Sequence, residues 1–188
     1  MNLDKRRELE HAKYHRAYAM NEKYRMKSQR MQDAVNDIHA LPIRGAYLDI
    51  SCGRGEMLRA ADKIGFGPIV GTEIVPELIG GNVYYAEVHK LPFLDNEFNV
   101  VTMFDVIEHL IPGDDELACR EMKRVARNYI VLTANNKPSF NKAGDDLHIN
   151  KRDYQEWDNL FREWFSGCNV TWISGKRHYI SEAWRIAL

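Results

Sequence analysis

The sequence lacks several features that would assign it to a specialised class of protein. Only three of its 188 residues are cysteines, without CxxC spacing, which argues against a disulfide framework and against a thiolate zinc site. No uncharged apolar stretch approaches the roughly 18 residues of a membrane span, and the first ten residues are too polar for a signal peptide. We therefore expect a cytoplasmic protein without a membrane partner.

The chain also lacks a strong overall charge, because 26 basic and 27 acidic residues leave a net charge of −1. Such a balance offers no global field for attracting nucleic acid. The charge is uneven, however: residues 1–44 hold ten Lys and Arg against six Asp and Glu, whereas residues 45–188 hold 16 against 21. We therefore predict an N-terminal helical cap over 1–44 and a larger domain over 45–188, joined as one structural unit.

With 45% apolar residues, 28% charged residues and only six prolines, the composition is otherwise that of a globular domain with one core. Two helices are expected in the cap. The segment 21–40 is predicted to be amphipathic, since its apolar residues recur at spacings of three and four. The segment 4–20 is helix-prone but only weakly periodic, so we expect a helix that can lie over another part of the protein.

After Gly45, short apolar runs closed by glycine or acidic residues alternate with helical segments, as in repeated β-α units. The last twenty residues contain two β-rich runs that predict an antiparallel hairpin. We therefore expect a Rossmann-like, doubly wound α/β fold with a seven-stranded, mostly parallel sheet. The expected strands are 46–50, 68–72, 82–86, 98–104 and 128–134, and the expected helices are 55–65, 114–126 and 151–165.

Three of the predicted strands end on acidic residues. Asp49 ends the first and is followed by the turn Gly53-x-Gly55, where glycines let the backbone approach a ligand. Glu73 ends the second, where a carboxylate can accept both hydroxyls of a ribose, and Glu87 ends the third. The residue three beyond Gly55 is Leu58 where the dinucleotide fingerprint needs glycine, so a ligand without a pyrophosphate is favoured.

Taken together, the segments YLDISCGRGE, VGTE, AEVHKLPF and FNVVTMFDVIEHL and the final hairpin resemble the class I S-adenosylmethionine-dependent methyltransferases. The resemblance is to the single-domain group with D-x-x-C-G-x-G and V-I-E-H-L motifs, and it covers about residues 45–188. It implies S-adenosylmethionine as the cofactor. It also implies a set of cofactor-binding residues: Asp49, Ser51, Cys52, Gly53 and Gly55 around the methionine moiety, Glu73 on the ribose, Ile74, Glu87 and Val88 at the adenine, and Phe104 beside the sulfonium.

The sequence departs from the pattern of that family in three places. Ser51 stands where glycine is usual, and its Cβ restricts positive φ. Asn99 interrupts the usual Phe-Asp-Val-Val. Only eight residues separate Glu73 from Asn82, which leaves little room for the usual second helix and leaves one flank of the cofactor pocket to be covered by another element.

Asp105, Glu108 and His109 have three open interpretations. They can simply begin the loop and helix after the fourth strand. Their D-x-x-E-H spacing also resembles the metal-binding E-x-x-E-H of ubiquinone-pathway O-methyltransferases and small-RNA 2'-O-methyltransferases, with Asp105 in place of the first Glu. Alternatively, His109 is a catalytic general base that takes the proton of the nucleophile. A divalent metal is therefore possible, although we do not expect one.

Substrate contacts are expected from two segments. Asn136, Phe140 and His148 follow the fifth strand and lie either in a capped loop or at the substrate mouth. Tyr14, Tyr18, Tyr24 and Arg25 belong either to a solvated face or to a lid. As part of a lid, Arg25 or Arg30 can pair with the cofactor carboxylate.

The expected function is methyl transfer from S-adenosylmethionine to an oxygen or nitrogen nucleophile of a small-molecule or sugar-like acceptor. Two other functions stay open. The chain can be a regulatory subunit that binds the cofactor without catalysis. It can also methylate a nucleic-acid end, because the basic N-terminal segment with its tyrosines can contact phosphates and stack on bases.

Overall fold

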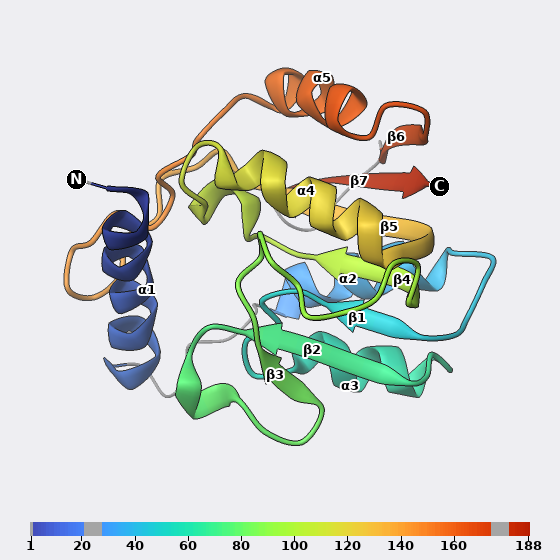
Figure 1. Cartoon of the computed structure of the whole chain (residues 1–188), viewed down its shortest axis with the longest axis horizontal. Coiled ribbons are helices and arrows are strands. Elements are labelled where there is room, and N and C mark those ends of the chain that lie inside the picture. The colour runs from blue at the N-terminus through green and yellow to red at the C-terminus, as the bar shows by residue number, and fades with distance from the viewer. Residues whose placement is uncertain (1, 21–27, 174–180) are drawn as a thin grey trace.

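A seven-stranded sheet forms the centre of the computed structural model, which describes residues 2–20, 28–173 and 181–188 (Figure 1). The strand order is β3-β2-β1-β4-β5-β7-β6. The first five strands in this order are parallel, and β7 runs antiparallel to both of its neighbours. The strands are β1 Tyr47–Asp49, β2 Ile69–Glu73, β3 Val83–Tyr85, β4 Phe98–Met103, β5 Ala126–Ala134, β6 Asn169–Ile173 and β7 Glu182–Ala187.

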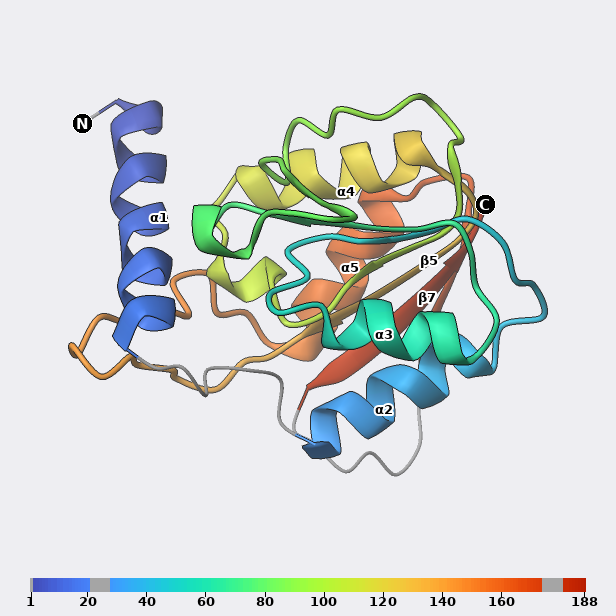
Figure 2. The same ribbon diagram turned by 90° about the horizontal axis from the view of Figure 1, so that it is seen from below.

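Helices cover both faces of this sheet. In Figure 2, α2 and α3 lie on one face and α4 and α5 on the other, while α1 stands apart beside the ends of the strands. The helices are α1 Leu3–Met20, α2 Ser28–His39, α3 Glu56–Lys63, α4 Asp114–Val125 and α5 Tyr154–Trp164, with short 3₁₀ helices η1 Pro76–Leu78 and η2 Ile107–His109. This is the Rossmann-like, doubly wound architecture expected of the sequence.

The core is divided by the sheet into two apolar layers, because successive strand residues point to opposite faces. In β1, Leu48 packs in the layer under α4 and α5, whereas Tyr47 packs in the layer under α2 and α3. Residues Ala34 and Ile38 of α2 are buried in that second layer. The amphipathic stripe predicted for the second helix is therefore what docks α2 on the sheet.

The predicted elements are present with shifted ends. The helix expected over 151–165 begins at Tyr154, because Asp153 and Glu156 form a capping box there. The helix expected over 21–40 is observed over Ser28–His39, and its predicted start falls in residues 21–27, outside the described part of the chain. The two strands of the C-terminal hairpin pair as predicted, and the residues between them, 174–180, also lie outside it.

Two of the departures noted in the sequence have structural counterparts. Between β2 and β3 the described chain forms only η1, so the usual second α-helix is absent there, as its short spacing predicts. The side-chain oxygen of Asn99 accepts a hydrogen bond from the amide of Ala46 at 2.9 Å. A Cβ at residue 45 would collide with that oxygen, so Asn99 requires Gly45 beside it.

No helix within the described residues combines the length and the apolarity needed to cross a membrane.

Candidate active site

A cavity of about 320 Å³ lies at the carboxyl ends of the parallel strands and beneath α1. Parallel sheets bind ligands at this edge. The cavity brings together most residues predicted from the sequence. Nine predicted cofactor residues line it, namely Asp49, Ser51, Cys52, Gly53, Glu73, Ile74, Glu87, Val88 and Phe104, as do Tyr14, Tyr18, Asp105, His109 and His148.

The loop after β1 forms the floor of this cavity through left-handed backbone conformations. Ser51 has φ 55° and Gly53 has φ 55°. Serine thus adopts the conformation that glycine adopts more easily, at a strain on the order of 1 kcal/mol. A Cβ at residue 53 would lie 2.7 Å from the hydroxyl oxygen of Tyr18, so the glycine is what allows α1 to approach the loop.

Asp49 brings a nearly buried carboxyl group to the cavity wall. Its Oδ1 accepts a hydrogen bond from the hydroxyl of Thr102 at 2.7 Å, and the hydroxyl of Tyr47 is 2.7 Å from the same Thr102 oxygen. Burial raises the pKa of Asp49 to about 7, with the Thr102 hydrogen bond acting against the rise and the charge of Glu73 adding to it. The group is therefore near its titration point at neutral pH.

Glu73 ties the end of β2 to the loop after β1. One of its carboxylate oxygens accepts a hydrogen bond from the amide of Gly53 at 2.9 Å, and the other accepts from the amides of Ile74 at 2.8 Å and Val75 at 3.2 Å. Burial raises the pKa of Glu73, although these three amides oppose the rise. Carboxylate oxygens have about four lone-pair sites, so Glu73 retains capacity for a ligand hydroxyl.

The end of the cavity near β3 is formed by Glu87, Val88 and His89, with His11 from α1 also in its wall. The His89 Nδ1 lies 3.5 Å from a carboxylate oxygen of Glu87. Burial lowers the pKa of His11, while Glu87 acts against that change. Two imidazole rings and the side chain of Glu87 therefore line this end.

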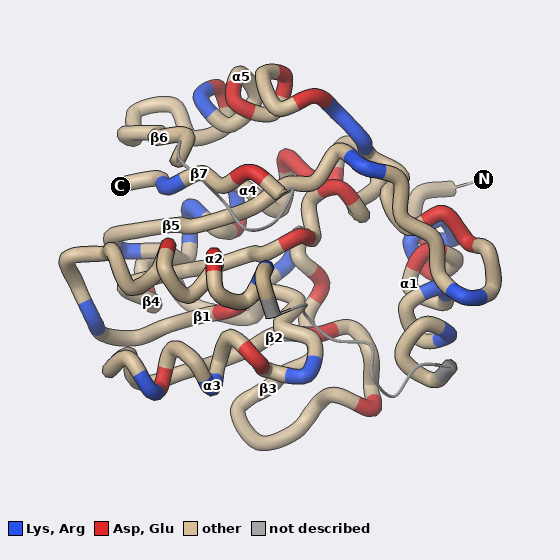
Figure 3. Tube along the Cα trace, turned by 180° about the vertical axis from the view of Figure 1, so that it is seen from behind, with Lys and Arg blue, Asp and Glu red and all other residues tan. Residues whose placement is uncertain are grey.

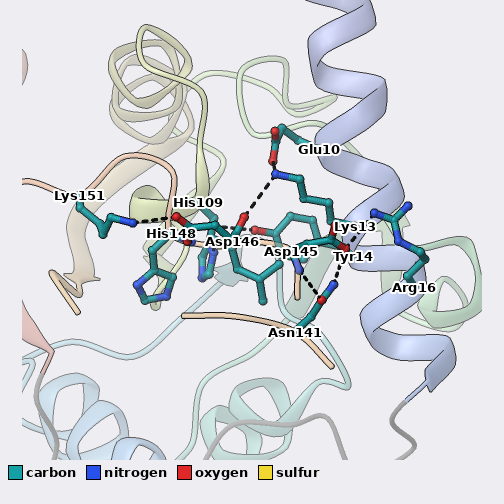
Figure 4. A network of polar contacts seen from close by, with 11 residues as sticks. Glu10, Lys13, Tyr14, Arg16, His109, Asn141, Asp145, Asp146, His148 and Lys151 are labelled. Atoms are coloured by element: carbon teal, nitrogen blue, oxygen red, sulfur yellow. Dashed lines mark hydrogen bonds and ion pairs between the residues drawn. The ribbon is translucent and has the colours of Figure 1, made fainter. Parts of the chain in front are cut away.

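Helix α1 forms the roof of the cavity, and polar contacts to the domain hold it there. The Arg7 guanidinium bonds both carboxylate oxygens of Asp114 at 2.8 and 2.5 Å. Figure 4 shows how α1 meets the loop after β5: Lys13 donates to the Asp146 carbonyl at 3.3 Å and Tyr14 to the Leu147 carbonyl at 3.5 Å. Further contacts come from Arg16, which pairs with Asp145 at 2.9 Å, and from His15, which lies 3.9 Å from Glu77 of η1.

These contacts account for part of the uneven charge of the sequence. Basic side chains of α1 pair with acidic side chains of the domain, and Figure 3 shows both kinds of residue where α1 meets the neighbouring loops. The helix also covers the flank left open by the missing second helix, since its side chains line the cavity together with Glu73 and Ile74.

The remaining end of the cavity contains the segment FDVIEHL. Asp105, at φ 52°, pairs with Arg30 at 2.6 Å and accepts a hydrogen bond from the Thr133 hydroxyl at 3.1 Å. Glu108 is fully buried behind the cavity wall, and burial raises its pKa well above the usual range; the charge of Asp105 adds to this rise, and nearby backbone amides oppose it.

His109 and His148 lie side by side at this end, with perpendicular rings whose centres are 4.5 Å apart. The Nδ1 atom of His109 is 2.8 Å from the Leu147 carbonyl, and the Nδ1 atom of His148 is 2.5 Å from the Lys137 carbonyl. Burial, followed by the neighbouring His148, lowers the pKa of His109 to about 3. His109 is therefore a neutral ring near neutral pH and accepts a proton poorly.

A model of the family described as "Methyltransferase domain" matches residues 20–182. The chain belongs to this family. This family match, together with the shared fold, identifies it as a class I S-adenosylmethionine-dependent methyltransferase, with S-adenosylmethionine as the cofactor. No curated protein matches the sequence.

Solved structures with low sequence identity share the methyltransferase fold. A Burkholderia thailandensis 1,6-didemethyltoxoflavin-N1-methyltransferase, with 1,6-didemethyltoxoflavin and S-adenosylhomocysteine bound, is 14% identical at a TM-score of 0.77, covering 100% of this chain and 90% of that one. The magnesium protoporphyrin IX methyltransferase of Synechocystis with bound S-adenosylmethionine is 14% identical at 0.59, covering 84% and 79%. A possible histamine N-methyltransferase of Thermotoga maritima is 18% identical at 0.66, covering 93% and 98%.

Several predicted site residues of the methyltransferase lie elsewhere. Gly55, at φ 71°, precedes α3 as its N-cap and does not line the cavity. Asn136 lies outside the cavity wall, and Phe140 is exposed. Tyr24 and Arg25 fall outside the described residues. Arg30 lines the cavity and pairs with Asp105.

Two residues of α1 that line the cavity beside the predicted Tyr14 and Tyr18, namely Arg7 and His11, were not predicted from the sequence. Arg7, His11, Tyr14 and Tyr18 follow one another at spacings of four, three and four residues, and all line the cavity. Such spacing places side chains on one face of a helix. A search for apolar periodicity alone passes over a face built from arginine, histidine and tyrosine. His89 and Ser139 also line the cavity, and we find no comparable signal in the sequence for either.

Proposed function

We propose that this methyltransferase transfers the methyl group to an oxygen or nitrogen nucleophile of a small molecule that is enclosed under α1. The observation that carries this proposal is the roofed cavity, whose volume of about 320 Å³ is near the lower end of the range for small-molecule pockets. Two structural neighbours, the toxoflavin and porphyrin enzymes, are named for small-molecule acceptors.

The proposed cofactor position follows the line of strand ends across the cavity. Asp49, Ser51, Cys52 and Gly53 surround the methionine moiety, with the Asp49 carboxylate facing its ammonium group. Glu73 binds the ribose diol by accepting a hydrogen bond at its remaining lone pair, and Ile74, Glu87 and Val88 surround the adenine. Support for this orientation comes from the two buried carboxyl groups of Asp49 and Glu73, which stand on adjacent strands of one cavity wall.

In this orientation Phe104 lies beside the sulfonium, and the acceptor occupies the space near Tyr14, His109 and His148. The chemistry is an in-line displacement at the methyl carbon. The cofactor supplies the reactivity, while the protein aligns the two reactants and excludes water. Since His109 accepts a proton poorly, the proposal gives this residue a binding role in place of the general-base role considered from the sequence.

The other two functions have less support. A nucleic-acid end would need exposed positive charge, yet Arg7 and Arg16 of the basic segment are already paired with Asp114 and Asp145. A purely regulatory subunit would need no enclosed acceptor space. All three cysteines are free, which favours a reducing, cytoplasmic compartment.

The test is transfer of a labelled methyl group from S-adenosylmethionine into fractionated small-molecule extract and, separately, into short oligonucleotides. We expect label in a small-molecule fraction. Label only in the oligonucleotides, or binding of S-adenosylhomocysteine without any transfer, would refute the proposed acceptor class.

Cofactor placement is tested separately by calorimetry with S-adenosylhomocysteine. Glu73→Gln should weaken binding about ten- to a hundredfold, the range for lost hydrogen bonds to a charged group. Glu77→Gln is the matched control, because the side chain of Glu77 in η1 is 73% exposed. Equal affinity in the two folded variants would remove the ribose assignment.

A further inference from the structure

The two histidines at the acceptor end are fixed in a single tautomer by backbone carbonyls. A carbonyl oxygen only accepts hydrogen bonds, so the Nδ1 atoms of His109 and His148 must each carry a hydrogen to bond Leu147 and Lys137. In a neutral ring this leaves the Nε2 lone pair to bind a ligand. Histidines that coordinate metals are held in the same way, with the second ring nitrogen donating to a carbonyl or carboxylate.

Glu108 lies next to this pair as a buried carboxyl group with unused lone pairs. It is 0% exposed, and neither side-chain oxygen makes a well-formed hydrogen bond to the described residues, although the backbone amides of Glu108 and Asn135 favour its ionised form. A buried carboxylate with so little compensation is unfavourable, and a bound cation reduces that penalty. Asp105 differs, because Arg30 and Thr133 already engage its carboxylate.

One ligand atom from each of Glu108, His109 and His148 lies within 4.8 Å of the others. Ligands that bind one transition-metal ion at about 2.0 to 2.2 Å are separated by roughly 3 to 4.4 Å, so small side-chain shifts bring the three into coordination. We propose that Glu108, His109 and His148 bind one divalent transition-metal ion at the acceptor end of the cavity.

The ligand chemistry limits the identity of the ion. Two imidazoles and one carboxylate suit zinc, manganese, iron, cobalt or nickel better than magnesium or calcium, which prefer oxygen ligands. The nearby charge of Arg30 disfavours positive charge at His109 and His148, and Asp105, which pairs with Arg30, offsets part of this effect at His148. His109 and His148 line the cavity, so the remaining coordination positions face the space that the acceptor occupies.

The role of this ion rests on the proposed function. A hydroxyl group of the acceptor takes an open coordination position, where the metal lowers its pKa, and its proton passes to the solvent as the acceptor enters the cavity. The oxygen lone pair then forms a bond to the methyl carbon. The carbon–sulfur bond breaks, and its electron pair stays on sulfur, which leaves the neutral thioether of S-adenosylhomocysteine. The site therefore favours oxygen over nitrogen as the methyl acceptor and needs no protein base.

The set of ligands also differs from the one considered from the sequence. Asp105 pairs with Arg30 and is not one of the proposed ligands. The third ligand is instead His148, from the loop after β5. Three protein ligands on one side of an ion leave open positions on the other, as in catalytic metal sites.

The experiment titrates cobalt(II) into the chelator-treated full-length protein and follows binding by calorimetry and by the visible absorption of the ion. We expect one ion per chain. Glu108→Gln and His148→Ala should each weaken binding at least tenfold, whereas His39→Ala should leave it unchanged because His39 is an exposed histidine at the end of α2. Circular dichroism and thermal unfolding establish that each variant is folded.

Two results would overturn the metal site: no stoichiometric binding by the folded wild-type protein, or equal binding by all three variants. If one of the two ligand-site variants is unfolded, the comparison of the other with His39→Ala decides. S-adenosylhomocysteine is titrated into the same metal-free samples. Binding of this ligand without metal binding removes only the metal site, whereas failure to bind it in the folded protein removes the proposed function.

Discussion

The buried carboxyl group of Asp49 makes cofactor binding dependent on pH in a predictable direction. Burial raises its pKa to about 7 in the ligand-free protein, and its one described hydrogen-bond donor is the Thr102 hydroxyl. The proposed ammonium partner favours the ionised form and lowers the pKa of Asp49 in the complex. Binding therefore releases a proton whenever Asp49 is protonated beforehand, and affinity must fall as the pH is lowered through 7.

The magnitude follows from the fraction of Asp49 that is ionised before binding. A pKa of about 7 gives roughly one-tenth ionised at pH 6.0 and roughly three-quarters at pH 7.5. The association constant for S-adenosylhomocysteine should therefore rise about eightfold over this range, equivalent to about 1.2 kcal/mol. At pH 7 the complex should release about half a proton, measured from binding enthalpies in buffers of different ionisation enthalpy.

The control is Asp49→Asn, which retains an oxygen acceptor for the Thr102 hydroxyl but cannot ionise. It should bind S-adenosylhomocysteine about as weakly at pH 7.5 as the wild type does well below pH 6, and its affinity should not follow the Asp49 titration. This comparison separates the effect of Asp49 from any effect of His11 and His89, whose side chains line the same cavity. A flat affinity between pH 6.0 and 7.5 in the wild type, or the same pH dependence in both proteins, would refute the reasoning.

Three further predictions concern stability and the roof of the cavity. Ser51→Gly should raise the free energy of unfolding by about 0.5 to 1 kcal/mol in urea titrations, because relief of the strain at φ 55° exceeds the extra entropy of glycine in the unfolded chain; a loss of stability would contradict the strain. Gly71→Ala should destabilise the domain by about 1 to 3 kcal/mol in the same assay, since its Cβ would lie 2.6 Å from the Cys52 sulfur, and an unchanged midpoint would show that the loop yields freely. Arg7→Ala should loosen α1 by about 1 to 2 kcal/mol by leaving the buried Asp114 without its bidentate partner. Hydrogen exchange in residues 3–20 should then be faster while exchange in the sheet stays the same, and equal rates in α1 would mean that this pair does not hold the roof.

Much of the fold follows from local patterns in the sequence. Apolar runs that end on Asp49, Glu73 or Glu87 mark strands whose carboxyl ends meet at one edge, so the meeting of these three residues in one cavity is predictable from their order. The short spacing between Glu73 and Asn82 is enough to predict that no full helix forms there. These patterns involve only residues that are close in the chain, and the strands that they predict are present in the structure.

The acceptor side depends on contacts between distant segments, and periodicity carries no information on such contacts. The sequence groups Asp105 with Glu108 and His109 because they are close in the chain. Folding instead brings Arg30 of α2 to Asp105 and brings His148 to His109. Likewise, Gly55 belongs to the same motif as Gly53 but is the N-cap of α3 and does not line the cavity. Which member of a motif touches a ligand is thus decided by the geometry of the turn.

The carbonyl of Leu147 accepts from two groups, the Tyr14 hydroxyl at 3.5 Å and the His109 ring at 2.8 Å. The first belongs to the roof and the second to the acceptor end. Because α1 covers the cavity, we expect it to move when the spent cofactor leaves, and this movement would remove one of the two groups that hold the carbonyl in place. We therefore expect departure of S-adenosylhomocysteine to limit the turnover rate, as opening steps do in many enzymes. Solvent viscosity would then slow steady-state turnover while leaving the first turnover unchanged.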